Sequence, residues 1–200
     1  MLENRLVKIA LVLFVAAVVT VFLGTPSDAK APDDQQNQGQ NRGRGNSTDS
    51  EQQTDANAER MLAEGKHTFR FDTFGDEVFW TDALQLHRAI EGAKFGGVGP
   101  GVSPKTALAV GLKVDSDALP ASLVAKLKQG RVDLDDPATT LALIKLDAVL
   151  GVKGTFNNDG SLKSVGITCA LCHSTVDNSL APGIGRRLDG WANRDLNVGA

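Results

Sequence analysis

The chain has 200 residues, a hydrophobic fraction of 42% and a formal net charge of −3 at pH 7. This length fits one ordinary domain with additional terminal segments. A mildly acidic chain offers no electrostatic basis for binding nucleic acid, so we expect no nucleic-acid partner. The sequence holds 2 cysteines and 3 histidines, which limits any site built from thiols and imidazoles to few residues.

The N-terminus has the pattern of an export signal. Arg5 and Lys8 precede an apolar run over residues 9–24, and Ser27-Asp28-Ala29 provides the small-x-small pattern that a signal peptidase cuts. The run is shorter than the ~20 apolar residues of a comfortable membrane span, so we predict a signal peptide over residues 1–29. The alternative is an uncleaved N-terminal anchor through residues 9–24, and either interpretation sends the rest of the chain across a membrane.

Residues 30–59 contain no Val, Ile, Leu, Met, Phe or Trp. Such a segment cannot bury enough apolar surface to offset the entropy of ordering it, and we therefore predict a disordered polar linker. The remaining residues, 60–200, form the predicted domain.

Prolines and glycines divide this domain into four predicted helices. Thr73, with Asp76 three residues later, resembles a capping box and opens a helix that ends at Glu91, before Gly92. Each of the other three helices begins at a proline and ends near a glycine, which are the positions that these residues favour. They run from Ser103-Pro104 to Gly111, from Leu119-Pro120 to Gly130, and from Asp136-Pro137 through Leu150 to Gly151.

A β-hairpin is predicted after the fourth helix, because Asp159-Gly160 lies between two alternating stretches at 152–156 and 161–165. Thr168 is then the predicted N-cap of a short helix over the residues that follow. The glycine-rich segment 96–101 is interpreted as a loop between helices, since a phosphate-binding loop would end in Gly-Lys-Ser/Thr. The expected fold class is therefore mainly α, with one small hairpin.

The clearest functional pattern is Cys169-Ala170-Leu171-Cys172-His173, which has the form Cys-x-x-Cys-His. Two thiols at this spacing can form thioethers with the two vinyl groups on one edge of a porphyrin, and the adjacent imidazole can then ligate the iron. A thioredoxin-type dithiol and half of a zinc site are the alternatives. The first expects a βαβ context, and the second needs four ligands, for which only His67 and His87 remain elsewhere.

This motif resembles the haem-attachment site of c-type cytochromes. The resemblance implies that Cys169 and Cys172 hold haem c covalently, that His173 is the proximal iron ligand, and that the fold is a cytochrome c-like helical domain. In class I members, a later proline carbonyl accepts a hydrogen bond from the imidazole, and a Gly-x-x-Leu-x-Gly-like turn follows. Pro182 and residues 185–190 are similar in order, with a shorter spacing. Assembly of bacterial c-type cytochromes on the periplasmic side agrees with the export signal.

The sequence departs from the family's pattern at the distal haem ligand. Class I cytochromes place a methionine well downstream of the motif, whereas Met1 and Met61 are the only methionines here. We expect the domain to be incomplete at its C-terminal end, with the distal ligand beyond residue 200. Within the chain, His87 is the candidate distal ligand because it falls on the apolar side of its predicted helix. A core-edge histidine bonded to a backbone carbonyl is the more ordinary interpretation of His87.

We therefore expect an exported c-type cytochrome that transfers electrons in the periplasm, with periplasmic or membrane redox proteins as partners. The alternative is the N-terminal part of a peroxidase-like or oxidase-like haem enzyme, since residues 69–80 resemble a segment of bacterial di-haem cytochrome c peroxidase-like proteins. Those proteins carry two Cys-x-x-Cys-His motifs, and this chain has one. A third hypothesis is a secreted module whose two cysteines form a redox dithiol or a disulfide.

Overall fold

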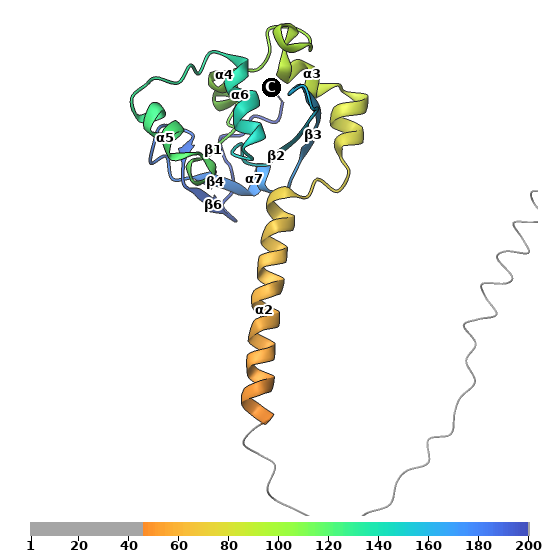
Figure 1. Cartoon of the computed structure of the whole chain (residues 1–200), viewed down its shortest axis with the longest axis vertical. Coiled ribbons are helices and arrows are strands. Elements are labelled where there is room, and N and C mark those ends of the chain that lie inside the picture. The colour runs from red at the N-terminus through yellow and green to blue at the C-terminus, as the bar shows by residue number, and fades with distance from the viewer. Residues whose placement is uncertain (1–45, 200) are drawn as a thin grey trace, which may run out of the picture. The chain divides into compact units, whose positions relative to one another are not determined.

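The computed structural model describes residues 46–199, which are mixed and mostly helical with small two-stranded sheets (Figure 1). The predicted signal peptide over residues 1–29 and the linker up to residue 45 lie outside the described residues. The helices are α2 (Asn46–Phe71), η1 (Val78–Ala83), α3 (Leu86–Glu91), η2 (Ala93–Phe95), α4 (Pro104–Ala109), η3 (Ser116–Ala118), α5 (Ala121–Lys128), α6 (Pro137–Lys145) and α7 (Ala170–His173). The strands are β1 (Val114–Asp115), β2 (Val152–Phe156), β3 (Leu162–Ile167), β4 (Ser174–Val176), β5 (Ile184–Gly185) and β6 (Arg187–Asp189).

The helix α2 is long and solvent-exposed, and it extends away from the other described elements (Figure 1). All of its side chains from 48 to 68 are exposed. The predicted disordered linker is therefore wrong for residues 46–59, which form the first half of this helix. The segment lacks large apolar residues, but it also lacks glycine and proline and contains alanine, glutamine and glutamate, which favour helix. None of the helices within residues 46–199 combines the length and the apolarity needed to cross a membrane.

The predicted helix from Thr73 to Glu91 is split in two. The π-helix η1 and the helix α3 meet at Gln85, whose φ of 52° lies in the left-handed region. Thr73 does not cap a helix, because its hydroxyl donates to the Glu77 carboxylate at 2.7 Å and Phe74 follows with a φ of 53°. Only the predicted end is confirmed: α3 stops at Glu91, with Gly92 as its C-cap.

The cause of this split is the outer edge of β3, along which the segment runs. The Asp76 carboxylate accepts from the Ile167 N–H at 3.0 Å. The Thr81 hydroxyl donates to the Val165 carbonyl at 2.9 Å and accepts from the Val165 N–H at 2.8 Å. The Glu91 carboxylate accepts from the Leu162 N–H at 3.0 Å. Three polar side chains thus take the place of a third strand, and they cover an edge that would otherwise be free to pair with another chain.

The remaining predicted helices begin where expected. Ser103 caps α4 by accepting from the Thr106 N–H at 3.2 Å, and Asp136 caps α6 by accepting from the Ala138 N–H at 3.0 Å. The predicted bounds of α5 are confirmed to within about two residues. The fourth helix ends at Lys145 and not at Leu150. Its predicted last turn instead leaves the helix and pairs with the segment at β1, where Ala148 O accepts from Asp115 N and Leu150 N donates to Lys113 O.

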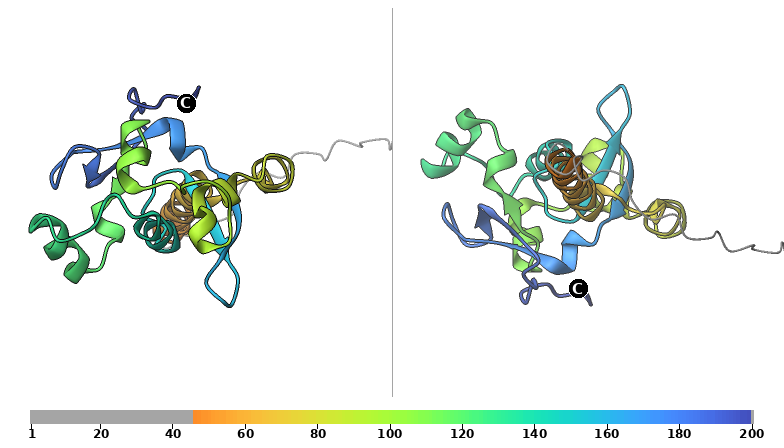
Figure 2. Two further views of the ribbon diagram at one scale, coloured as in Figure 1. Left: turned by 90° about the horizontal axis from the view of Figure 1, so that it is seen from above. Right: turned by 90° about the horizontal axis from the view of Figure 1, so that it is seen from below.

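The predicted hairpin is confirmed as β2 and β3, which pair antiparallel with Val152 opposite Ile167 and Gly154 opposite Val165. Figure 2 shows its tip extending away from the other elements. The hydrophobic core lies where this hairpin meets α3 and α6, around Ile144, Leu162 and Val165, each at most 2% exposed. Two further pairs of short strands were not predicted: β1 with β5, in parallel, and β4 with β6, antiparallel.

Candidate functional site

The Cys-x-x-Cys-His motif forms a single helical turn, α7, between β3 and β4. Cys169, Cys172 and His173 are exposed, and the two thiols are free. Ala170 is 0% exposed, and Leu171 is half-buried. Residues three and four positions apart share one face of a helix, so the two thiols and the imidazole lie on the outer face while Ala170 and Leu171 lie inside.

Two hydroxyl groups hold the two ends of the motif. The buried Thr168 hydroxyl donates to the Arg70 carbonyl at 3.1 Å, which joins the start of the motif to the end of α2. The predicted side-chain cap by Thr168 is therefore wrong, and α7 has no side-chain cap. At the other end, the Ser174 hydroxyl, 0% exposed, donates to the Asp189 carboxylate at 2.8 Å.

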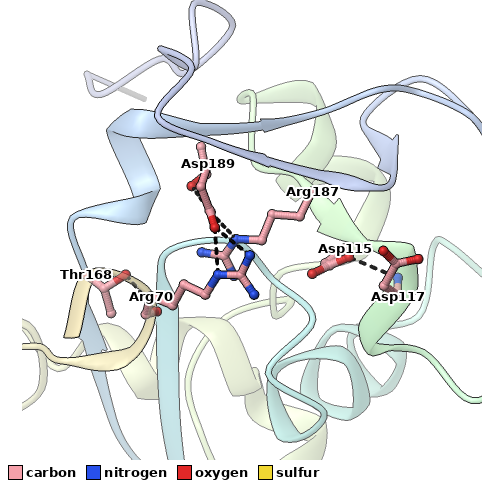
Figure 3. Close-up of polar contacts among 7 residues, drawn as sticks. Arg70, Asp115, Asp117, Thr168, Arg187 and Asp189 are labelled. Carbon is pink, nitrogen blue, oxygen red and sulfur yellow. Dashed lines mark hydrogen bonds and ion pairs between the residues drawn. The ribbon is translucent and has the colours of Figure 1, made fainter. Parts of the chain in front are cut away.

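The acceptors of these two bonds, Arg70 and Asp189, belong to one ion cluster. Figure 3 shows the Asp189 carboxylate facing the guanidinium groups of Arg70 and Arg187. Arg70 donates to one carboxylate oxygen through Nε at 2.7 Å and Nη2 at 2.5 Å. Arg187 donates to the other oxygen through Nε at 2.6 Å. Burial alone would raise the pKa of Asp189, but hydrogen bonds from Arg70, Ser174 and Arg187 outweigh that effect and hold the pKa below its usual value.

The Arg187 side chain is 5% exposed, and its Nη2 has no partner among the described residues. None of the three charged residues of this cluster was predicted as part of the site. Arg187 and Asp189 are two positions apart in a strand, which places them on one face, but nothing in the local pattern identifies Arg70 as their partner. The predicted Gly-x-x-Leu-x-Gly-like turn over residues 185–190 is instead the end of β5 followed by β6.

The segment 190–193 runs beside the motif. Gly190 N–H donates to the His173 carbonyl at 2.8 Å, and Asn193 N–H donates to the Cys172 carbonyl at 2.9 Å. Trp191 belongs to this segment and is 67% exposed. Trp191 therefore adds exposed apolar surface close in sequence to two residues that bond to the motif, and it was not predicted from the sequence.

The predicted second partner of the imidazole is not found. Pro182 is exposed in a turn where Ile184 N–H donates to the Ala181 carbonyl at 2.9 Å. Within residues 46–199, no hydrogen bond joins Pro182 to His173, and the His173 imidazole makes none. The expected acceptor role of Pro182 is therefore absent from the described arrangement.

The structure does not bring His87 to the motif. Its helix α3 packs on β3 and α6, and Glu91 bonds to Leu162 at the hairpin end of β3, whereas the motif follows the other end. The hydrogen bond from His87 to a backbone carbonyl, which the more ordinary interpretation predicted, is also not formed. His87 Nδ1 is buried and has no partner in the described part of the chain.

An apolar cavity of about 380 Å³ lies on the inner side of α7. Leu171 forms part of its wall, together with residues from α3, α4, β1, α6, β2 and β3, but the two thiols and the His173 imidazole do not. The motif and the cavity are therefore on opposite faces of the same turn.

The geometry also bears on the two other interpretations of the cysteines, a redox dithiol or disulfide and a zinc site. The two thiols are not joined in a disulfide. Across residues 46–199, no group of three or more His, Cys, Asp or Glu side chains is arranged to hold a metal ion. No family model, curated protein or solved structure matched the chain.

Proposed function

We propose that the chain is an exported c-type cytochrome that holds one haem c covalently at Cys169 and Cys172, with His173 as the proximal iron ligand. The observation that carries this proposal is the shared outer face of α7, where two free thiols and one imidazole are exposed together. Covalent attachment needs both thiols and the imidazole on the same side of the backbone. When bound, the haem iron would supply one-electron redox chemistry.

The surrounding residues support this role by fixing the turn. Thr168 and Ser174 hold the two ends of the motif through hydroxyl hydrogen bonds, and Ala170 fills a fully buried position between them. A backbone fixed on both sides limits the directions in which the His173 imidazole can point, and a fixed orientation strengthens an axial ligand. The exposed Trp191 offers an aromatic surface next to the backbone of the motif.

The finer parts of the proposal come from the sequence. They are a cytochrome c-like fold, delivery to the periplasm, retention at the membrane through residues 9–24 where this segment is not cleaved, and electron exchange with periplasmic or membrane redox proteins. The export pattern at residues 1–29 supports the compartment, because c-type haem is attached outside the cytoplasm in the bacterial cytochromes that the motif resembles.

The test is expression of the full chain with its own export signal in a host that attaches haem c. We expect the mass of one haem per chain and a pyridine haemochrome band of the type that thioethers give. The Cys169→Ala/Cys172→Ala double variant should carry no covalent haem, and His173→Ala should lose the proximal ligand and shift the visible bands of any haem that is attached. His67→Ala is the matched control, because His67 is exposed on α2 and should leave haem content unchanged. A folded chain without covalent haem would refute the proposal.

A further inference from the structure

The cavity behind α7 has features of a small-molecule site that the haem proposal does not use. Its volume of about 380 Å³ falls in the range of protein ligand pockets. Its wall is almost wholly apolar and carries no charged side chain. An apolar engineered cavity of about 150 Å³ stays dry and takes up benzene, so a cavity more than twice that size has room for two fused rings.

One polar atom in this wall has no partner. Thr140, on α6, is 4% exposed and lines the cavity, and its Oγ1 makes no hydrogen bond among the described residues. Buried hydroxyl groups are nearly always bonded, so an unbonded one on a residue that lines a cavity points to an absent partner. A helical threonine usually bonds back to a carbonyl of the preceding turn, and Thr140 does not.

The other two polar wall residues, Thr106 and Asn197, are exposed. Thr106 Oγ1 pairs with the Ser103 hydroxyl at 3.1 Å, and Asn197 Oδ1 accepts from Gly199 N–H at 3.2 Å. A buried water needs two to four polar partners, and Thr140 is the one buried polar residue that lines this wall, so water alone satisfies its hydroxyl poorly. A carboxylate or an ammonium group would enter without a counter-charge, at a large desolvation cost.

We propose that this cavity binds a neutral, two-ring-sized apolar molecule that carries one hydrogen-bonding oxygen, such as a bicyclic phenol, alcohol or ketone, with the Thr140 hydroxyl as its polar contact. The proposal rests on the cavity and on Thr140 alone. It does not depend on haem attachment, because the thiols and the imidazole of the motif do not line the cavity.

The test is calorimetric titration of the full chain, as purified, with 1-naphthol, naphthalene and 1-naphthoate as probes. We expect one 1-naphthol per chain, and about fivefold weaker binding of 1-naphthol in Thr140→Val, the ratio that one net neutral hydrogen bond gives. Naphthalene should bind the chain and Thr140→Val equally, and 1-naphthoate should not bind. Thr140→Val should also unfold at an equal or higher denaturant midpoint, because it removes an unbonded buried hydroxyl.

Ala107→Leu provides the second variant, since Ala107 lines the cavity and is 7% exposed. A larger side chain there should weaken both neutral probes at least tenfold while leaving the circular dichroism spectrum unchanged. Equal 1-naphthol affinity in the chain and in Thr140→Val would overturn the polar contact. Binding of 1-naphthoate as tightly as 1-naphthol, or unchanged binding in a folded Ala107→Leu variant, would overturn the site. All variants contain the same apolar run at residues 9–24, so any nonspecific binding of the probes to that run contributes equally to every titration.

Discussion

Thr81 carries two hydrogen bonds that a third strand would otherwise make. Its hydroxyl bonds both the N–H and the carbonyl of Val165, and both residues are buried. Thr81→Val keeps the shape but leaves two buried backbone groups unpaired, at about 1–3 kcal/mol for each group. We expect the free energy of unfolding to fall by about 2–5 kcal/mol in urea denaturation, with an unchanged dependence on urea concentration. Thr155→Val on the exposed side of β2 is the control, with an expected change within about 0.5 kcal/mol.

Asp189 makes the stability of the motif region depend on pH. Its folded pKa lies below the ordinary value of 3.8, because the hydrogen bonds from Arg70, Ser174 and Arg187 favour the carboxylate despite burial. A group with a lowered folded pKa stabilises the fold above its unfolded pKa, and this contribution is lost as the pH falls below about 4 toward the folded pKa. Asp189→Asn should therefore have a lower free energy of unfolding than the natural chain at pH 7. The difference between the two free energies should become smaller as the pH falls. Denaturation midpoints between pH 7 and pH 3 measure this, and a gap that widens in acid would contradict it.

Under the proposed function, we expect His87 not to ligate the iron, because Glu91 of the same helix bonds at the hairpin end of β3, away from the motif. We expect His87→Ala to leave the visible spectrum of the haem-loaded chain unchanged, with His67→Ala as the control. A change from a low-spin to a high-spin spectrum in His87→Ala alone would show that His87 is the distal ligand.

Gly151 determines how closely α7 can approach β2. It has a φ of 75°, and a Cβ there would collide with the backbone nitrogen of Leu171 in the motif. Gly130 has a similar φ of 63°, but a Cβ there would meet no atom within 4 Å. An alanine at Gly130 therefore measures the cost of the backbone conformation alone, without a steric collision. Gly130→Ala should cost about 1–2 kcal/mol, the ordinary penalty of the left-handed region. Gly151→Ala should cost more than Gly130→Ala in urea denaturation. Under the proposed function, Gly151→Ala should also lower the haem content per chain, whereas Gly130→Ala should leave it unchanged.

The elements that could be predicted from sequence are those whose ends depend on neighbouring residues. Ser103 and Asp136 cap their helices locally, and the hairpin follows from a local turn signal. The errors lie where distant partners decide: the segment from Thr73 to Glu91 breaks to bond β3, and the fourth helix ends early to pair with β1. Propensity is a weak guide when tertiary hydrogen bonds compete with it.

The candidate site divides in the same way. The motif residues are contiguous, so Cys169, Cys172 and His173 could be named from the sequence. The cluster that holds them could not, because Arg70 and Asp189 are 119 positions apart and only the fold brings them together. The same is true of the cavity, whose wall combines residues from six elements and from α7.

At the scale of the whole molecule, the described residues divide into a packed body and an exposed helix. Both edges of β3 form hydrogen bonds, one edge with β2 and the other with side chains such as Thr81. By contrast, all side chains of α2 from 48 to 68 are exposed. Amide exchange depends on local opening, which is easiest where few buried contacts oppose it. Hydrogen-exchange mass spectrometry of the full chain should show exchange in residues 48–68 at least about tenfold faster than at Val165 and Ile167. Equal protection of both regions would show that α2 is covered in solution.

The outward direction of Cys169, Cys172 and His173 has a consequence for how the protein is made. Ala170 and Leu171 complete the inner packing of the turn, while the two cysteines and the histidine of the motif contribute exposed surface. Under the proposed function, the chain can finish folding before its cofactor arrives, and attachment becomes a late step in maturation. The machinery that joins haem to this chain then meets a preformed surface patch with Trp191 beside it. Recognition at that step would depend on a folded shape, and substitutions that distort the turn would first appear as failures of maturation.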